Sequence, residues 1–215
     1  MRSMRLDHVS YAAGPDGLVA TAERLGAALG ESFHDGGVHP RFGTRNMLLP
    51  LAGGQYIEVV AVLDHPASDK VPFGKLVRDR SEEGGGWLCW VVAVDDITEV
   101  EHRLGRHAVP GNRRQPDGFD LRWLQIGVKG LHADPQLPFV VQWEAPASRH
   151  PSAGASGEIW LQALEIAGSQ DRLEQWLGSD ALTALADVEV DWVAEHGQPG
   201  IVAVHVGTPS GSVRL

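Results

Sequence analysis

Cysteine is almost absent from this chain of 215 residues, in which Cys89 is the only one. A single thiol excludes an internal disulfide and any Cys-x-x-Cys motif, and it fits a reducing compartment. Because Cys89 lies within an apolar run, we expect a buried and unreactive thiol.

Long hydrophobic runs are also lacking. The longest uninterrupted apolar run covers residues 87–94, whereas roughly 18 apolar residues are needed to span a bilayer. Arg5, Asp7 and His8 stand near the N-terminus without an apolar stretch behind them. We therefore expect neither a transmembrane helix nor a signal peptide, and a cytoplasmic location.

Positive charge is scarce, with 18 Lys and Arg against 28 Asp and Glu and a formal net charge of -10. A phosphate backbone or an anionic membrane surface is repelled on average, which argues against nucleic-acid and membrane partners. The sequence also lacks Gly-x-Gly-x-x-Gly, P-loop and His-Glu-x-x-His patterns. A small molecule is the partner that remains.

Glycine and proline are plentiful, at 26 and 13 residues, and 43% of the chain is hydrophobic. This composition predicts a globular protein with many turns. Residues 5–13 alternate like a strand, and the apolar spacing over residues 18–29 predicts a helix that Gly30 ends. Residues 86–94 and the helical positions Ile97, Val100 and Leu104 repeat this order at an offset of 79.

Three further strand-like runs follow each strand and helix pair, bounded by glycine and proline. The runs are residues 31–39, 44–51 and 55–63 in the first case, and 107–115, 120–129 and 138–144 in the second. The pattern predicts an α+β fold with two βαβββ units, residues 5–64 and 86–145, joined by a connection with a short helix around residues 73–80.

A third, divergent unit of the same kind is predicted over residues 158–215. It would contain strands at 159–167, 188–194, 201–206 and 211–215 and a short helix at 172–177. The stretch 146–157, rich in Ala, Ser, Pro and Gly, is expected to be a linker. This third unit is expected either to pack against the first two or to be exchanged in a homodimer.

The repeated unit, with a His on its first strand and a Glu on its last, resembles the vicinal oxygen chelate superfamily. That group includes glyoxalase I, extradiol dioxygenases and fosfomycin-resistance proteins. More narrowly, the chain resembles the glyoxalase-like domain family over about residues 5–145. The matching motifs are Leu6-Asp7-His8-Val9, His39-Pro40 with Gly43-Thr44 and Asn46, Tyr56-Ile57-Glu58, Leu121-Arg122-Trp123, and Pro138-Phe139 with Trp143.

The resemblance implies that two units form a cupped, barrel-like mixed sheet around a divalent metal such as Zn, Ni, Mn or Fe. His8 and Glu58 are then metal ligands from the first unit, and Glu58 is also the catalytic candidate. On the last strand of the second unit, Gln142 or Glu144 matches Glu58, depending on the register. The counterpart of His8 at offset 79 is Trp87, which cannot bind a metal, so a four-ligand set is not present.

Several other residues are candidate substrate contacts, and each has a structural alternative. His39 and Asn46 are expected at the mouth of the cup, or in a turn shaped by Pro40. Trp87 and Trp123 are expected to form an aromatic wall, or to fill the core. Arg122 is expected to bind a substrate carboxylate, or to form a surface ion pair. His8 can equally be a hydrogen-bonded core histidine.

Glu58 lies within an apolar strand, where an unpaired carboxylate is expensive to bury. A metal, a polar cavity or a salt bridge must therefore accompany it. Two functions follow from the resemblance. The first is a metal-dependent lyase or isomerase that acts on a small oxygenated or carbonyl substrate. The alternative is a metal-free protein that binds or sequesters a small molecule without catalysis, for which Trp87 is the main argument.

Overall fold

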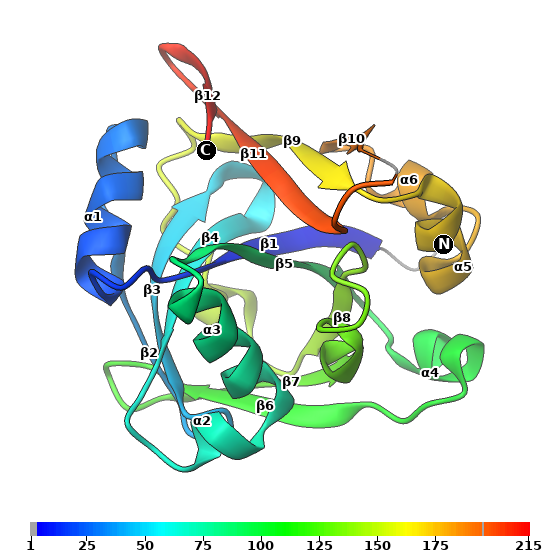
Figure 1. The fold of residues 1–215 in the computed structure, drawn as a ribbon, viewed down its shortest axis with the longest axis horizontal. Coiled ribbons are helices and arrows are strands. Elements are labelled where there is room, and N and C mark those ends of the chain that lie inside the picture. Colours follow the sequence, from blue (N-terminus) through cyan, green and yellow to red (C-terminus); the bar gives the residue numbers. More distant parts are fainter. Residues whose placement is uncertain (1–3, 195) are drawn as a thin grey trace.

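An eight-stranded barrel forms the larger part of the protein, and a four-stranded sheet packs against it (Figure 1). The computed structural model describes residues 4–194 and 196–215. The first unit of the barrel consists of β1 (Met4–Ala12), α1 (Leu18–Leu29), β2 (His34–His39), β3 (Thr44–Leu51), η1 (Ala52–Gly54) and β4 (Gln55–Val62). The predicted helix over residues 18–29 is confirmed, and Gly30 ends it in a left-handed conformation with a φ of 72°.

The second unit repeats the order of the first. It consists of β5 (Gly86–Val94), α4 (Thr98–Leu104), β6 (Val109–Arg114), β7 (Asp120–Ile126), η2 (Val128–Gly130) and β8 (Phe139–Trp143). The connection between the units contains α2 (Ala67–Lys70) and α3 (Pro72–Glu82). Pro72 begins α3, where its missing N–H is not needed.

The strands close in the order β1-β4-β3-β2-β6-β7-β8-β5. Within each unit the first strand runs parallel to the last, as β1 does to β4 and β5 to β8. The two units meet where β1 pairs antiparallel with β5 and β2 pairs with β6. The predicted α+β fold with a cupped, barrel-like mixed sheet is therefore confirmed.

The C-terminal region differs from the first two units in topology. After η3 (Ala147–Arg149) it consists of β9 (Trp160–Ala167), α5 (Gln170–Leu177), α6 (Ala181–Ala184), β10 (Glu189–Val193), β11 (Gly200–Thr208) and β12 (Gly211–Arg214). Its sheet has the order β10-β9-β11-β12, and β9 runs parallel to β10, the next strand along the chain. The elements follow the predicted order along the chain, but their arrangement is not that of the barrel units.

The second sheet and the barrel share one hydrophobic core. Side chains of β1 and β5, including Val9 and Trp90, pack in one cluster with Leu164 of β9 and Val204 of β11. A separate cluster, which includes Phe42, Phe73, Cys89 and Phe139, lies toward the inside of the barrel. Strand alternation thus sends one set of side chains toward the second sheet and the other set into the barrel.

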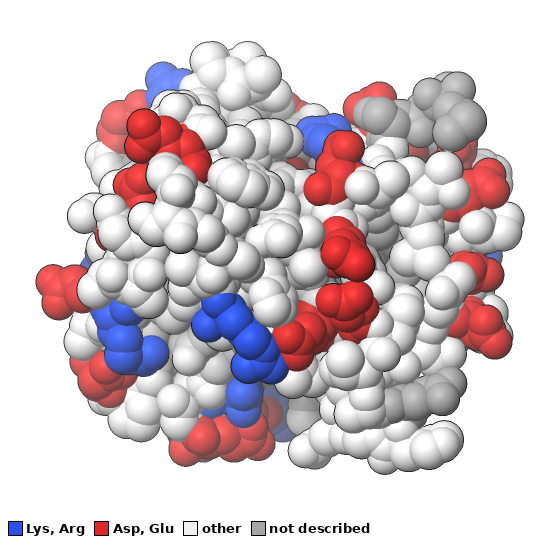
Figure 2. All heavy atoms as spheres, turned by 90° about the horizontal axis from the view of Figure 1, so that it is seen from above, with Lys and Arg blue, Asp and Glu red and all other residues white. Residues whose placement is uncertain are grey.

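Acidic side chains are spread over the face seen in Figure 2, and basic side chains form only small groups on it. This distribution agrees with the formal charge of -10. Among the residues that the structure describes, no helix has the length and apolar character needed to cross a membrane.

Candidate functional site

The inside of the barrel contains a cavity, which we call the cup. The cavity has a volume of about 480 Å³, including its open mouth. Most lining side chains are aromatic or aliphatic, and α3 contributes Phe73. The lining residues are His8, His39, Phe42, Tyr56, Glu58, Phe73, Arg113, Trp123, Gln125, Val128, Phe139, Val141 and Trp143. A small ligand with a planar apolar part fits such walls.

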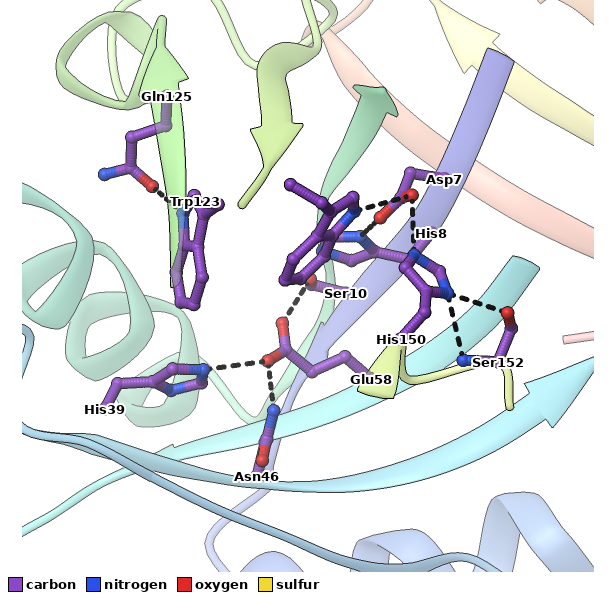
Figure 3. A network of polar contacts seen from close by, with 11 residues as sticks. Asp7, His8, Ser10, His39, Asn46, Glu58, Trp123, Gln125, His150 and Ser152 are labelled. Atoms are coloured by element: carbon purple, nitrogen blue, oxygen red, sulfur yellow. Dashed lines mark hydrogen bonds and ion pairs between the residues drawn. The ribbon is translucent and has the colours of Figure 1, made fainter. Parts of the chain in front are cut away.

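Glu58 of β4 is a buried carboxylate in the cup, held by two donors from neighbouring strands. Ser10 Oγ donates to Glu58 Oε2 at 2.6 Å, and Asn46 Nδ2 donates to Glu58 Oε1 at 2.7 Å (Figure 3). Burial alone raises the pKa of Glu58, but His39, His8 and the two donors more than offset it, so the pKa lies below its usual value. Glu58 is thus an ionised carboxylate at neutral pH.

His39 stands next to Glu58, with its Nε2 atom 3.8 Å from Glu58 Oε1. Its Nδ1 atom contacts Thr44 Oγ1 at 3.0 Å. Burial lowers the pKa of His39 from 6.5 to about 4, although Glu58 acts in the opposite direction. At neutral pH His39 is therefore an uncharged ring beside an ionised carboxylate.

His8 is oriented by the residue before it. A β-bulge interrupts the pairing of β1 with β5 between Leu6 and His8, so Asp7 and His8 both point to buried surroundings. Asp7 Oδ2 accepts a hydrogen bond from His8 Nδ1 at 2.8 Å, and His8 stacks on Tyr56 with ring centroids 4.3 Å apart. This geometry engages His8 Nδ1 with Asp7 and leaves Nε2 as the other polar atom of the ring that lines the cup.

Asp7 gathers two more donors behind the cup. Trp143 Nε1 and His150 Nε2 both lie 3.1 Å from Asp7 Oδ1. Burial raises the pKa of Asp7, but the hydrogen bonds and charges of His150 and His8 together outweigh burial and hold the pKa well below its usual value, so Asp7 stays ionised. Since an ionised carboxylate only accepts hydrogen bonds, it fixes both histidines with a proton on the nitrogen that faces it.

The segment that carries His150 is the predicted linker at residues 146–157. The segment connects two parts of the fold, and side-chain contacts also hold it against the barrel. His150 Nδ1 contacts Ser152 Oγ at 2.7 Å (Figure 3). The His150 ring packs edge-on against Tyr56 and Trp143. The segment therefore supports the cup from outside through Asp7.

Four of the predicted site residues come together in the cup. His8, His39, Glu58 and Trp123 all line the cavity. Asn46 lies directly behind Glu58, fully buried, and its amide orients the carboxylate.

Arg122 and Gln142 lie outside the cup, which corrects two expectations. Trp123 and Gln125 of β7 face inward, so Arg122, which directly precedes Trp123, faces out and pairs with Asp120 at 2.7 Å. On β8 the odd-numbered residues line the cavity. Gln142 therefore faces out and accepts a hydrogen bond from the Ile97 N–H at 2.8 Å. Glu144 is exposed, so it does not replace Gln142.

Trp87 also lies outside the cup. A bulge in the pairing of β5 with β1 sets Tyr11 opposite Trp87 and Ser10 opposite Cys89, and the intervening residue has no partner. Trp87 packs in the core shared with the second sheet, and its Nε1 donates to Leu215 O at 3.2 Å. Cys89 is the β5 residue beside Ser10 and Glu58.

A metal centre of the kind implied by the resemblance does not fit these residues. The second unit presents Val141, Phe139 and Trp143 where it would have to supply ligands. Within residues 4–194 and 196–215, no group of three His, Cys, Asp or Glu side chains is placed to hold a metal ion.

Sequence reasoning missed Asp7, Ser10, Arg113 and His150. Ser10 shares a strand face with His8 in regular alternation, whereas Asp7 would point to the opposite face without the bulge. Arg113 and His150 offer no comparable local signal, because their roles depend on contacts with distant strands.

The profile of the family described as glyoxalase-like domain matches residues 6–182. A hypothetical protein from Staphylococcus aureus has a similar structure, with a TM-score of 0.58 and 17% identity over 98% of this chain and 85% of that one. Methylmalonyl-CoA epimerase from Streptomyces coelicolor, in complex with 2-nitronate-propionyl-CoA, gives a TM-score of 0.44 and 19% identity over 66% of this chain and 99% of its own. A mutant of 4-hydroxymandelate synthase from Streptomyces coelicolor gives a TM-score of 0.45 and 14% identity over 100% of this chain and 63% of its own. No curated protein matches the chain significantly.

Proposed function

The chain belongs to the glyoxalase-like domain family, and we propose that it is an enzyme that binds a small carbonyl compound in the cup and moves a proton on it, as a lyase or an isomerase. The observation that carries this proposal is Glu58, an ionised carboxylate held in an aromatic cavity next to His8 and His39. Such a carboxylate serves as a general base toward a bound substrate.

Glu58 would remove the proton from the carbon next to the carbonyl group. The electron pair of the broken C–H bond moves onto the carbonyl oxygen, which becomes negatively charged. Hydrogen-bond donors near the developing charge stabilise it. His8, oriented through Nδ1 by Asp7, is the candidate donor once its Nε2 carries a proton.

The second half of the reaction depends on the substrate. Return of the proton from Glu58 to a neighbouring carbon gives an isomerase. Departure of a leaving group from the next carbon with the electrons of its bond, followed by transfer of the proton from Glu58 to that group, gives a lyase. No step in this scheme passes through a metal, because the residues of the cup do not fit one.

Proton exchange in heavy water tests the proposal without knowledge of the product. Small 2-oxo acids, 2-hydroxy ketones and 2-oxoaldehydes are incubated with the protein in D2O, and loss of the signal from the hydrogen next to the carbonyl is followed by NMR. We expect catalysed exchange for one of these classes and its loss in Glu58→Gln. Glu144→Gln, an exposed carboxylate on the outer side of the barrel, is the matched control and should retain exchange.

Binding without catalysis is the second candidate, and one observation favours it. The second unit contributes mainly aromatic and aliphatic side chains to the cup, such as Phe139 and Val141. If the protein only sequesters its ligand, the Glu58→Gln variant should bind that ligand as tightly as the wild type does. Neither protein should then catalyse proton exchange of any compound. That result would overturn the enzymatic proposal.

The compartment we propose is the cytoplasm. Cys89 is a free, buried thiol, and a reducing environment keeps it so. Cell fractionation with an antibody against the untagged protein tests this, and recovery from an oxidising compartment would contradict it.

A further inference from the structure

Arg113 is a buried cation in the wall of the cup. It lies on β6, two residues after Gly111, and its residue exposure is 3%. Within the part of the chain that the structure describes, no hydrogen bond or ion pair joins it to another side chain, and its Nε atom is fully buried without a partner.

An unpaired guanidinium in such a place needs an explanation. Arginine stays charged in proteins, and removing its charge from water without a counter-ion costs several kcal/mol. Glu58 and Asp35 act on the Arg113 charge through space, but neither forms an ion pair or a hydrogen bond with its guanidinium. Glu58 already accepts hydrogen bonds from Ser10 and Asn46, and Asp35 lies 3.5 Å from Arg45.

We propose that Arg113 binds the carboxylate of the ligand, so that the substrate of the cup is a small organic acid with an aromatic or other planar apolar part. This inference deepens the proposed function and rests on it. The two-pronged guanidinium matches a carboxylate through two parallel hydrogen bonds.

The walls of the cup specify the rest of the ligand. Trp123 packs over Gly111, where a Cβ atom would collide with the indole ring, so this glycine leaves the tryptophan its place beside Arg113. Phe42 and Phe139 complete an aromatic surface on which a ring can stack. Arg113 also lines the open cleft next to the cup, so the anionic end of the ligand lies toward that cleft.

Benzoate and benzamide are the probes for this proposal, because they share shape and differ in charge. Their affinities are measured by NMR titration and by thermal shift. We expect benzoate to bind wild-type protein at least about tenfold more tightly than benzamide. Arg113→Gln should lose this preference, and Arg113→Lys should keep part of it.

Arg122→Gln is the matched control, since Arg122 is an exposed arginine on the adjacent strand. It should bind benzoate like the wild type. Equal affinities of wild-type protein for the two probes, or no benzoate binding up to the solubility limit, would overturn the proposal even if Arg113→Gln failed to fold. Unchanged benzoate binding by Arg113→Gln would also overturn it.

Glu58→Gln separates this inference from the proposed function. Benzoate has no hydrogen on a carbon next to a ketone or aldehyde group, so its binding does not require proton transfer. Glu58-dependent exchange without benzoate selectivity refutes only the carboxylate site. Selective benzoate binding without any exchange refutes only the enzymatic proposal.

Discussion

Glu58 remains ionised inside an apolar barrel because its neighbours compensate for lost water. Two donors, Ser10 and Asn46, satisfy its oxygens, and two histidines lie near it. Charge-assisted hydrogen bonds of this kind are stronger than neutral ones. The donors are therefore part of the machinery that sets the protonation state of Glu58.

Removal of one donor should affect both stability and protonation. We expect Ser10→Ala to lower the free energy of unfolding by about 1.5 to 3 kcal/mol, since a buried charge loses a partner. The same change should raise the pKa of Glu58. Chemical denaturation measures the first effect, and a carbon-13 NMR titration of the Glu58 carboxyl measures the second.

Ser212→Ala is the control for this comparison, because Ser212 is exposed on β12. It should leave both quantities unchanged. A Ser10→Ala protein of wild-type stability and unaltered Glu58 titration would contradict the role assigned to this donor.

His39 should make stability depend on pH in a window above that of the carboxylates. The unfolded chain takes up a proton near pH 6.5, whereas folded His39 does so only near 4. The stabilisation that depends on neutral His39 is therefore fully present above about pH 6.5. The free energy of unfolding falls by roughly 3 kcal/mol in total as the pH drops toward 4, and this loss does not grow further below that pH. Free energies of unfolding are measured between about pH 7 and about pH 4. Their slope against pH should be weaker in His39→Gln than in wild type.

His107→Gln serves as the control for that slope. The His107 side chain is fully exposed, so its removal should leave the slope of the wild type. Parallel curves for wild type and His39→Gln would show that His39 titrates normally in the folded protein.

At the scale of elements, two irregular features position the cup. The bulge in β1 brings Asp7 and His8 together, and the segment after β8 places His150 on Asp7. Neither feature belongs to regular alternation. Both serve to hold the imidazole of His8 in one orientation.

His150→Ala tests the support that comes from this segment. We expect a loss of about 1 to 3 kcal/mol in stability, because a buried hydrogen bond to an ionised carboxylate disappears. Proton exchange should slow, because Asp7, which orients His8, loses one of its hydrogen-bond donors. Thermal unfolding and the NMR exchange assay measure these effects. His107→Ala, a change of an exposed histidine, is the control. A His150→Ala protein indistinguishable from wild type would show that the segment is only a connection.

At the scale of the whole molecule, the two units of the barrel are unequal. The first contributes His8, His39 and Glu58, whereas the second contributes Arg113, Gln125 and apolar walls. A metal in such a barrel would need ligands from both units. The asymmetry instead suits a site that divides its work between proton transfer on one side and ligand binding on the other.

Metal removal should therefore have no effect on the protein. We expect elemental analysis of untagged protein, purified and dialysed without chelator, to find Zn, Ni, Mn and Fe far below one equivalent, because three-ligand sites are absent from the described residues. Proton exchange should survive treatment with EDTA. One equivalent of metal that is lost in His8→Ala would contradict this prediction.

The second sheet belongs to the same folding unit as the barrel. Its Leu164 and Val204 lie in one cluster with Val9 and Trp90 of the barrel strands. The order of its elements was predictable from the sequence, but its strand order β10-β9-β11-β12 was not. Pairing of strands depends on long-range contacts that the sequence pattern does not encode.

The sequence by itself determined the elements and the paired units of the barrel. Apolar periodicity is a local property, so the helix at residues 18–29 and the strands at 44–51 and 86–94 were predicted with the bounds that the structure gives them. The family resemblance placed Glu58 in the cup, and the cost of burying a carboxylate in an apolar strand required a metal, a polar cavity or a salt bridge beside it.

Only the tertiary structure decided which side chains face the cup. A bulge in the pairing of β5 with β1 accompanies the outward position of Trp87, whereas the register of β7 and β8 turns Arg122 and Gln142 outward by regular alternation. Arg113 and His150 entered the site through strands and segments that are distant along the chain. Their roles are fixed by three-dimensional packing, since no local pattern specifies which distant carboxylate or cavity a side chain will meet.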